Sequence, residues 1–217
     1  TGKAVTVSGY AISGADAGNY SLVQPTGVTA DITQRSLAVT GATAANKTYD
    51  ALLGAVISGG AISAISGDAV TLDSSGRAGA FADKNVGTAK AVTVSGYTIS
   101  GADAGNYSLI QPTGVTADIT RLTLNVTGAS AANKTYDALL AATISGGAIS
   151  AISGDAVTLV TTGRAGVFAD KNVGTGKAVT VSGYALSGAD AGNYSLVQPT
   201  GVTADITRLT LNVTGAT

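Results

Sequence analysis

Short runs in which apolar and polar residues alternate are the main pattern of this chain. Residues 122–127 read Leu-Thr-Leu-Asn-Val-Thr, and residues 115–120 read Val-Thr-Ala-Asp-Ile-Thr. Residues 92–95 and 70–72 repeat the pattern with Val, Thr, Ser and Leu. A period of two with many β-branched residues predicts strands that bury one face. Threonine on the other face keeps a strand soluble without charge.

Glycine-containing pairs separate these runs and mark the turns between them. Ser-Gly, Gly-Gly and Gly-Asp recur along the whole chain. The alanine-rich residues 60–69 are the only helical candidate, and Ser-Gly pairs interrupt that stretch as well. Short strands with frequent turns predict an all-β fold, with antiparallel strands in a sandwich or a barrel.

One 87-residue block occurs repeatedly along the chain without insertion or deletion. Residues 14–20, Gly-Ala-Asp-Ala-Gly-Asn-Tyr, recur at 101–107 and 188–194. Residues 44–130 and 131–217 differ at only 11 of 87 positions. Tandem near-copies give a protein length or many equivalent surfaces, whereas an enzyme needs one well-made site.

The segment Ala-Asp-Ile-Thr closes each copy and sets the predicted boundaries. It divides the chain into the C-terminal part of a repeat (1–33), a first full repeat (34–120), a second full repeat (121–207) and the first strand of a further repeat (208–217). We expect these 217 residues to come from a longer array. Each full repeat is long enough to fold around a core of its own.

The motif Asp-Ala-Gly-Asn-Tyr sharpens the fold prediction. Asp103 lies four residues before Tyr107, and Leu109 follows two residues later. This spacing is similar to the tyrosine corner of immunoglobulin-type sandwiches, where Leu22, Leu109 and Leu196 would replace a core cysteine. We therefore predict tandem Ig-like β-sandwich modules in an elongated array, with β-grasp-like modules and a β-solenoid as alternatives. A ligand-binding loop is the other interpretation of the motif.

Composition narrows the range of functions. Cys, His, Met, Trp and Glu are absent, all 13 acidic residues are Asp, and the net charge is −1. The charge balance excludes a basic stripe for nucleic acid, and the chain has no amphipathic segment suited to membrane insertion. Without His, Cys or Glu, neither a catalytic triad nor a Cys-ligated zinc site can be assembled. We therefore expect no enzymatic activity and no cofactor.

Calcium is the metal that Asp-containing loops could bind. Asp31, Asp118 and Asp205 lie at the predicted repeat boundaries, where a bridging Ca²⁺ would stiffen an array. Other Asp residues, such as Asp68 and Asp83, have the neighbours typical of turns. The lysine and asparagine residues of each repeat also leave an intramolecular isopeptide bond open.

Asparagine occurs mostly in the N-glycan acceptor pattern Asn-x-Ser/Thr. Seven of the nine Asn residues match it, although Ser and Thr are common and repetition inflates the number. The candidate glycosylation sites are Asn19, Asn46, Asn106, Asn125, Asn133, Asn193 and Asn212.

A series of motifs recurs in the same order in each repeat. It reads Asn-Lys-Thr-Tyr-Asp at 46–50, Phe-Ala-Asp-Lys-Asn-Val-Gly at 81–87, Val-Ser-Gly-Tyr at 94–97 and Gly-Ala-Asp-Ala-Gly-Asn-Tyr at 101–107. Together these motifs resemble the YDG repeat modules of very large bacterial surface proteins, among them filamentous-haemagglutinin-like adhesins exported by two-partner secretion. The structural signature residues are Tyr49, Asp50, Phe81, Asp103, Tyr107, Tyr136, Asp137, Phe168, Asp190 and Tyr194.

One position departs from the motif that gives these modules their name. The glycine of Tyr-Asp-Gly is replaced by Ala51 and Ala138. If the turn requires a positive φ, alanine is strained there. The resemblance implies an extracellular, repetitive, β-rich stalk, on the bacterial cell surface or secreted, with no catalytic residues.

Three functions are compatible with the sequence. We expect a structural stalk or fibre repeat of a large extracellular bacterial adhesin or biofilm matrix protein, which gives length and display. The alternatives are a multivalent repeat that binds glycans or host proteins weakly, and a filament or sheath subunit that associates through strand edges. The expected partners are neighbouring repeats, other copies of the protein, and host glycans or surface proteins.

Overall fold

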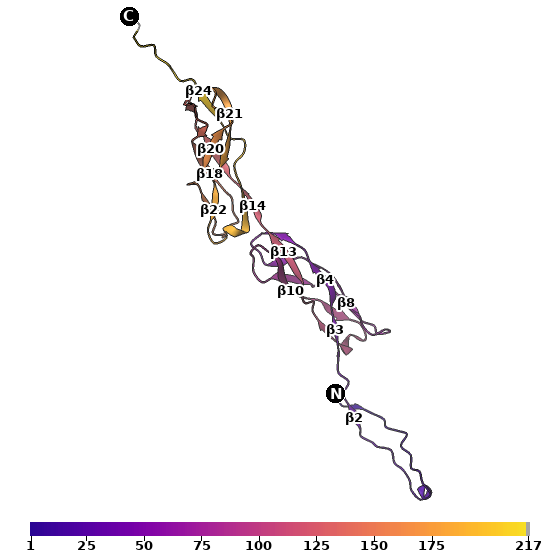
Figure 1. Ribbon diagram of the computed structural model, residues 1–217. Helices are drawn as coiled ribbons and strands as arrows, with labels where there is room; N and C mark the ends of the chain where they lie inside the picture. The colour runs from indigo at the N-terminus through magenta and orange to yellow at the C-terminus, as the bar shows by residue number, and fades with distance from the viewer. Residues whose placement is uncertain (216–217) are drawn as a thin grey trace. The chain divides into compact units, whose positions relative to one another are not determined.

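The computed structural model describes residues 1–215, and their regular structure is β except for three short 3-10 turns (Figure 1). The predicted all-β class is therefore confirmed. The described residues form two compact units. Unit 1 comprises residues 1–42, 59–77 and 95–112, and unit 2 comprises residues 43–58, 78–94 and those from 113 onward. The first repeat contributes to both units, whereas the second repeat lies entirely in unit 2.

The second repeat shows the strand order in full. Its centre is a five-stranded sheet of order β16-β24-β21-β20-β17, and the pairs β14–β23, β15–β18 and β19–β22 complete it. The elements are β14 (Leu122–Asn125), β15 (Thr127–Ala131), β16 (Lys134–Thr135), β17 (Ala141–Ala142), β18 (Ile144–Ala148), β19 (Thr158–Val160), β20 (Ala165–Phe168), β21 (Gly174–Ser182), β22 (Ala185–Ser187), η3 (Ala191–Asn193), β23 (Tyr194–Val197) and β24 (Thr203–Thr207).

The five-stranded sheet is nearly closed, like a barrel. A single lysine links its two edge strands: Lys134 on β16 donates hydrogen bonds to the carbonyl oxygens of Leu139 (2.7 Å) and Ala141 (3.0 Å), and Ala141 begins β17. The same ammonium group lies 2.8 Å from a carboxylate oxygen of Asp137 and 5.4 Å from the ring centroid of Phe168. Because a lysine donates three hydrogen bonds, this one side chain satisfies edge carbonyls that no strand covers.

The Ig-like sandwich is not confirmed. Strand pairing gives one nearly closed sheet and three two-stranded sheets in the second repeat.

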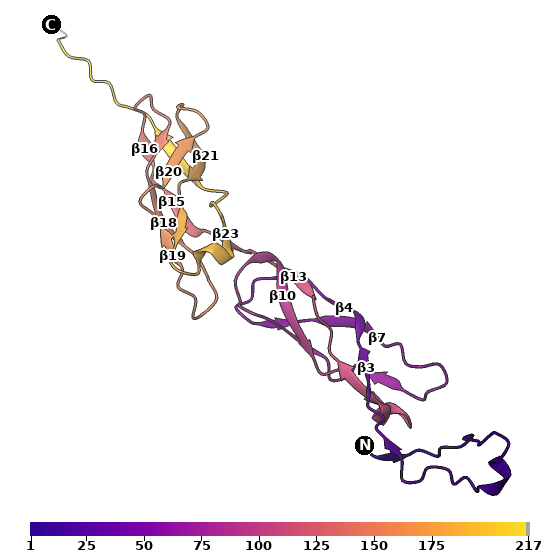
Figure 2. The same cartoon turned by 60° about the horizontal axis from the view of Figure 1, so that its bottom comes forward.

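In Figure 2, β16, β20 and β21 lie at one end of this repeat, and β19 and β23 lie at the other. We call these the sheet end and the turn end.

The first repeat has the same strand order 87 residues earlier in the chain. Its five-stranded sheet, β5-β13-β10-β9-β6, falls in unit 2, and the pairs β8–β11 and β3–β12 fall in unit 1. The elements are β3 (Arg35–Ala38), β4 (Thr40–Ala44), β5 (Lys47–Thr48), β6 (Gly54–Ala55), β7 (Ile57–Ala61), β8 (Thr71–Asp73), β9 (Ala78–Phe81), β10 (Gly87–Ser95), β11 (Thr98–Ser100), η2 (Ala104–Asn106), β12 (Tyr107–Ile110) and β13 (Thr116–Thr120).

Two strand pairs in each repeat are parallel, which the sequence pattern did not predict. In the second repeat, β14 runs parallel to β23 and β16 runs parallel to β24. In the first repeat the corresponding parallel pairs are β3–β12 and β5–β13. Alternation of apolar and polar residues fixes which face of a strand is buried but carries no information on the direction of its neighbour.

The core of the second repeat follows the predicted alternation. Val179 and Val181 on β21 are buried and flank the exposed Thr180. Phe168 and Ile206 are each only 1% exposed. The complete cluster is Val126, Ile144, Phe168, Val179, Val181, Tyr184, Val202, Ala204 and Ile206.

Residues 1–33 form a thin part of unit 1, with β1 (Lys3–Ala4) paired to β2 (Thr29–Ala30) and η1 at Ala17–Asn19. Most of their large apolar side chains are exposed. Tyr10 is 63% exposed, whereas its copy Tyr97 is 2% exposed. The interpretation of 1–33 as the C-terminal part of a repeat stays a prediction.

The segment after β24 is not a strand between residues 208 and 215. Residues 216 and 217 lie outside the described part, so the first strand over 208–217 stays a prediction. The equivalent strand β14 pairs with β23, 72 residues later in the chain. Leu211, the copy of the buried Leu124, is exposed.

The expected strain at the substituted motif glycine is confirmed. Ala51 and Ala138 have φ angles of 64° and 67°, in the left-handed region that favours glycine. The conformation is imposed by the neighbouring aspartate: Asp50 accepts a hydrogen bond from the backbone N–H of Leu52 (2.9 Å), and its Oδ1 lies 2.8 Å from Lys47 Nζ. The Lys–Asp contact thus holds a turn that alanine does not favour.

Restoring glycine at both sites should stabilise the protein. We expect Ala51→Gly with Ala138→Gly to raise the free energy of unfolding by roughly 0.5–1 kcal/mol per site, because relief of left-handed strain exceeds the extra entropy of glycine in the unfolded chain. Chemical denaturation measures the effect. The matched control is Ala45→Gly with Ala132→Gly, two exposed alanines without a positive φ. A loss of stability in the first variant as large as in the control would contradict this account.

Candidate functional site

The most elaborate polar site of the described residues lies within unit 2, where the second repeat meets the first. The sheet end of the first repeat contributes Tyr49 and residues 84–86, which we call the tail surface. The turn end of the second repeat contributes residues 152–155 and 190–194, which we call the head surface. The residues of each surface recur 87 positions away in the other full repeat, so both full repeats carry a head surface and a tail surface.

A buried carboxylate lies at the centre of this junction. The side chain of Asp155 is only 2% exposed. Its Oδ2 accepts hydrogen bonds from the hydroxyl groups of Tyr49 (2.7 Å) and Tyr194 (2.5 Å), and its Oδ1 accepts one from Lys84 Nζ (2.5 Å). Lys84 also lies 3.2 Å from Asp190. Donors from both repeats therefore satisfy one charge that water does not reach.

The pKa values of these groups show how strongly the charge is held. Burial alone would raise the pKa of Asp155, but the hydrogen bonds from Lys84, Tyr194 and Tyr49 outweigh it and lower that pKa below its usual value. The hydrogen bond to Asp155 raises the pKa of Lys84. Burial and the same carboxylate raise the pKa of Tyr194 to about 12. The junction therefore holds Asp155 ionised, with Lys84 charged and Tyr194 neutral.

A second contact lies beside the carboxylate. Asn193 is 5% exposed, its Oδ1 accepts a hydrogen bond from the backbone N–H of Val86 (3.0 Å), and its Nδ2 donates one to Asn85 Oδ1 (3.1 Å). The rings of Tyr49 and Tyr194 meet edge to face, with centroids 5.4 Å apart. Such an aromatic pair adds to the burial of its two rings.

The head surface is ordered within its own repeat before it meets a neighbour. Asp190 Oδ2 accepts a hydrogen bond from the backbone N–H of Ala156 (2.9 Å), and the hydroxyl of Tyr194 accepts one from Ile152 (3.2 Å). The first repeat has the same bonds at Asp103–Ala69 and Tyr107–Ile65. The tyrosine corner of an Ig-like sandwich is not confirmed: the hydroxyl of Tyr107 accepts its hydrogen bond from the backbone N–H of Ile65, 42 residues earlier in the chain.

The first residue of each repeat also fixes this turn. Gln34 Nε2 donates a hydrogen bond to the carbonyl of Gly105 (3.0 Å), and Arg121 Nε donates one to Gly192 (3.0 Å). Two different side chains at equivalent positions thus make the same bond. The turn that carries Asn193 and Tyr194, like its copy in the first repeat, is therefore held whether the first residue of the repeat is Gln or Arg.

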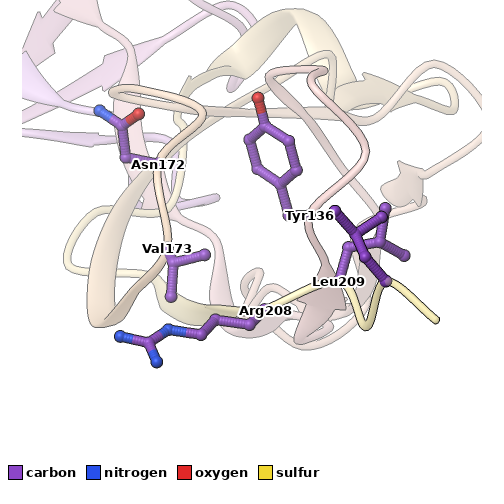
Figure 3. A pocket seen from close by; sticks show the side chains of 6 residues that line it. Tyr136, Asn172, Val173, Arg208 and Leu209 are labelled. Carbon is purple, nitrogen blue, oxygen red and sulfur yellow. The ribbon is translucent and has the colours of Figure 1, made fainter. Parts of the chain in front are cut away.

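The second repeat carries an uncovered copy of the tail surface. Tyr136, Asn172 and Val173, the copies of Tyr49, Asn85 and Val86, surround a hollow of about 530 Å³. Figure 3 shows these three side chains around the opening, with Arg208 and Leu209 also lining it. Val173 is 46% exposed, and Tyr136 is only partly buried, whereas Tyr49 is 2% exposed.

The first repeat carries the corresponding uncovered copy of the head surface, in unit 1. Asn106 is exposed, although its copy Asn193 is buried. Asp68, the copy of Asp155, accepts a hydrogen bond from Tyr107 at 2.5 Å. Identical sequences therefore occur once covered and once uncovered, and the difference in exposure measures what the junction buries.

The structural signature residues separate into three roles. Tyr49, Asp190 and Tyr194 meet at the junction. Phe81 and Phe168 fill the cores under Lys47 and Lys134, which pair with Asp50 and Asp137. Asp103 and Tyr107 hold the uncovered head surface, and Tyr136 belongs to the uncovered tail surface.

The candidate glycosylation sites lie in different environments. Asn193 is buried at the junction with its amide hydrogen bonded, so a glycan there is incompatible with this contact. Asn46 and Asn133 accept hydrogen bonds from the backbone N–H groups of Asp118 and Asp205. The other candidates are exposed, and for them glycosylation remains a prediction: Asn19, Asn106, Asn125 and Asn212.

The aspartates proposed for calcium have other partners. Asp31, Asp118 and Asp205 accept hydrogen bonds from the backbone N–H groups of Gly2, Ala89 and Gly176. For Asp118 and Asp205 this contact lies at an irregularity in the strand register. Within residues 1–215, no group of three or more His, Cys, Asp or Glu side chains is placed to hold a metal ion.

Sequence reasoning missed the ion pair at the centre of the junction. The neighbours of Asp68 placed it in a turn, and the pairing of its copy Asp155 with Lys84 was not predicted. One available signal was the recurrence of both the Lys-Asn-Val and Gly-Asp segments in each repeat. That recurrence alone does not say that the two segments meet across a boundary.

Comparison with known proteins gives one match. A family model described as the YDG domain matches residues 33–116 and 120–204. No curated protein and no solved structure matches the chain. None of the helices formed by the described residues has the length and apolar character needed to cross a membrane.

Acid should weaken the junction through Asp155. Its pKa is lower in the folded than in the unfolded protein, so the stabilisation is complete above the unfolded value of about 4 and is lost as pH falls through the folded value. We expect Asp155→Asn to lower the melting temperature at pH 7 and to flatten its decline below about pH 4. The control is Asp68→Asn, the same change at an uncovered head surface. Identical acid profiles for the two variants would contradict the assignment.

Proposed function

The chain belongs to the YDG domain family, and we propose that its repeats form the stalk of a large extracellular bacterial adhesin or matrix protein, where they provide length and display. The junction between the two repeats carries this proposal. It is built from Asp155 and Asn193 on one side and Tyr49, Lys84 and Val86 on the other. These residues recur in each repeat, so the same contact can form at every boundary of an array.

The geometry of the contact supports an open array. The head and tail surfaces are different parts of one repeat, so the interface is heterologous: each repeat offers one surface to the repeat before it and the other to the repeat after it. Such contacts do not pair off and stop, as a two-fold symmetric interface does. Stability then accumulates as a sum over repeats and their nearest-neighbour interfaces.

The connection between the repeats also limits bending. Strand β13 ends at Thr120 and β14 begins at Leu122, so one residue separates the last strand of one repeat from the first strand of the next. A flexible linker needs many more residues. With the buried Asp155 contact beside it, this short connection favours a fixed spacing between consecutive repeats.

The stalk proposal is tested by the distance between equivalent points on the two repeats. The chain has no Cys, so Thr93→Cys with Thr180→Cys on exposed positions of β10 and β21 gives two unique attachment points for spin labels. We expect one narrow distance distribution. It should broaden when Asp155→Ala and Asn193→Ala break the junction.

The matched control uses the uncovered copies of these residues. Asp68→Ala with Asn106→Ala makes the same chemical changes on the first repeat and should leave the distribution narrow. A broad distribution in the parent protein, or equal broadening in both variants, would exclude a stalk of fixed spacing.

A second candidate function, self-association into a filament or sheath, is favoured by a different surface. Leu52 and Leu53 are exposed beside the strained Ala51, and their copies Leu139 and Leu140 are exposed in the same way. Leu52 is 64% exposed and Leu139 is 60% exposed, so the junction does not cover this pair. Exposed apolar side chains that recur on each repeat suit lateral contacts between chains, and a net charge of −1 gives little repulsion.

Lateral association predicts a concentration-dependent sedimentation coefficient. Replacing Leu52, Leu53, Leu139 and Leu140 with Ser should abolish that dependence, with the circular dichroism spectrum unchanged because these side chains lie outside the core. Sedimentation of the parent protein as a monomer at all concentrations would remove this candidate and would leave the stalk proposal intact.

A further inference from the structure

We infer that each repeat contains a mechanical clamp, formed by its parallel strand pairs, that resists tension applied through the two ends of the repeat. The inference rests on the proposed stalk function for its biological use, because only a stalk is loaded in this way. Its physical basis is independent of that function. It follows from the direction in which the terminal strands of a repeat run.

The terminal strands of the second repeat are held by parallel partners. The first strand, β14, pairs in parallel with the penultimate strand, β23, from Leu122–Tyr194 to Asn125–Val197. The pairing continues to the hydrogen bond between the N–H of Val126 and the carbonyl of Val197 (3.0 Å). The last strand, β24, pairs in parallel with β16, and the N–H of Tyr136 bonds the carbonyl of Thr207 (2.9 Å).

Tension acts on such a pair in one particular direction. A force through the chain pulls β14 backwards, toward its own N-terminus, and pulls β23 forwards, toward its own C-terminus. Because the two strands point the same way, the opposed forces lie along the strand axis. The strands must slide past one another, so the cross-strand hydrogen bonds are loaded together and do not open one at a time.

The antiparallel pairs inside the repeat are protected by this arrangement. A hairpin such as β20–β21 opens bond by bond when its ends are pulled apart. The pair β19–β22 also lies between Val126 and Tyr194 in the sequence. This pair forms a sheet of its own that contains neither terminal strand, so tension does not open it until β14 separates from β23 or β24 separates from β16. The clamp therefore decides the force at which the repeat opens.

Side chains resist the same sliding motion. Leu124 on β14 and Val126 just after it are buried, so displacement of β14 along its axis would pull both from their packing positions. Across the pair, the hydroxyl groups of Thr123 and Ser195 lie 3.2 Å apart. Apolar packing and polar contacts are therefore lost in the same step as the backbone bonds, which increases the cooperativity of opening.

The first repeat shows the same arrangement. In unit 1, β3 pairs in parallel with β12, and the N–H of Val39 bonds the carbonyl of Ile110 (2.9 Å). In unit 2, β5 pairs in parallel with β13, and the N–H of Tyr49 bonds the carbonyl of Thr120 (2.8 Å). The first strand of each repeat thus has a parallel partner even though the residues of β3 and β14 differ.

Single-molecule stretching of the full chain tests the clamp. We expect two principal force peaks, one for each complete repeat. Thr123→Cys with Ser195→Cys places a disulfide directly across β14 and β23, in a chain with no other cysteine. When oxidised, this variant should lose one of the two peaks. Its contour length should fall by about 250 Å, since 72 residues no longer extend.

A disulfide across an internal pair is the matched control. Thr158→Cys with Ser187→Cys bridges β19 and β22, which face each other in register and lie 29 residues apart. Its oxidised form should keep both peaks at the parent force and lose only about 100 Å of contour length. Reduction should restore the parent trace in both variants, which shows that each substitution preserves the fold.

Three results would overturn the clamp: a parent trace without force peaks, two unchanged peaks in the oxidised Thr123–Ser195 variant, or loss of a peak in the oxidised control. These results are separate from the label-distance test. A narrow label distance without force peaks excludes the clamp and keeps the stalk. Force peaks with a broad label distance exclude a stalk of fixed spacing and keep the clamp.

Discussion

The buried carboxylate of Asp155 is the interaction on which the coupling of the two repeats depends. A charge removed from water is tolerated only when it is paired and fully hydrogen bonded. Here the donors come from both sides: Tyr194 belongs to the same repeat as Asp155, whereas Tyr49 and Lys84 belong to the preceding one. Separation of the repeats would remove two of the three donors. The arrangement of consecutive repeats is thus specified by one charge that needs both of them, and not by apolar area, which is less selective about geometry.

The two copies show what a junction changes in a repeat. Asp68 and Tyr107 keep the same hydrogen bond that Asp155 and Tyr194 make, so the head surface is formed before any neighbour arrives. The main changes are in burial, most clearly between Asn106 and Asn193. A preorganised surface loses little conformational entropy when it is covered.

Much of the fold could be predicted from the sequence, and the limits have physical reasons. Alternation located the strands and the buried Val179 and Val181, and the missing motif glycine predicted the left-handed strain at Ala51 and Ala138. Strand direction was not predictable, because a period of two is the same for parallel and antiparallel neighbours. The tyrosine corner is not confirmed, and a five-residue motif cannot show that the hydroxyl of Tyr107 reaches Ile65. The junction was missed because a repeated segment has the same sequence whether it is covered or free.

The positions at which the two copies differ show whether the residues of the junction are kept. Residues 44–130 and 131–217 differ at 11 positions, and none of the residues named on the head and tail surfaces is among them: Tyr49, Lys84, Asn85, Val86, Asp68, Asp103, Asn106 and Tyr107 are all repeated unchanged. Each of these residues has a fixed partner on the neighbouring repeat or within the turn that presents it, so a change in one copy would disturb a boundary. Several differences fall on exposed positions instead, such as Val56, which becomes Thr143. Other differences are conservative changes at half-buried positions, such as Ile99, which becomes Leu186. This pattern is expected if contact between consecutive repeats is the property that the sequence maintains.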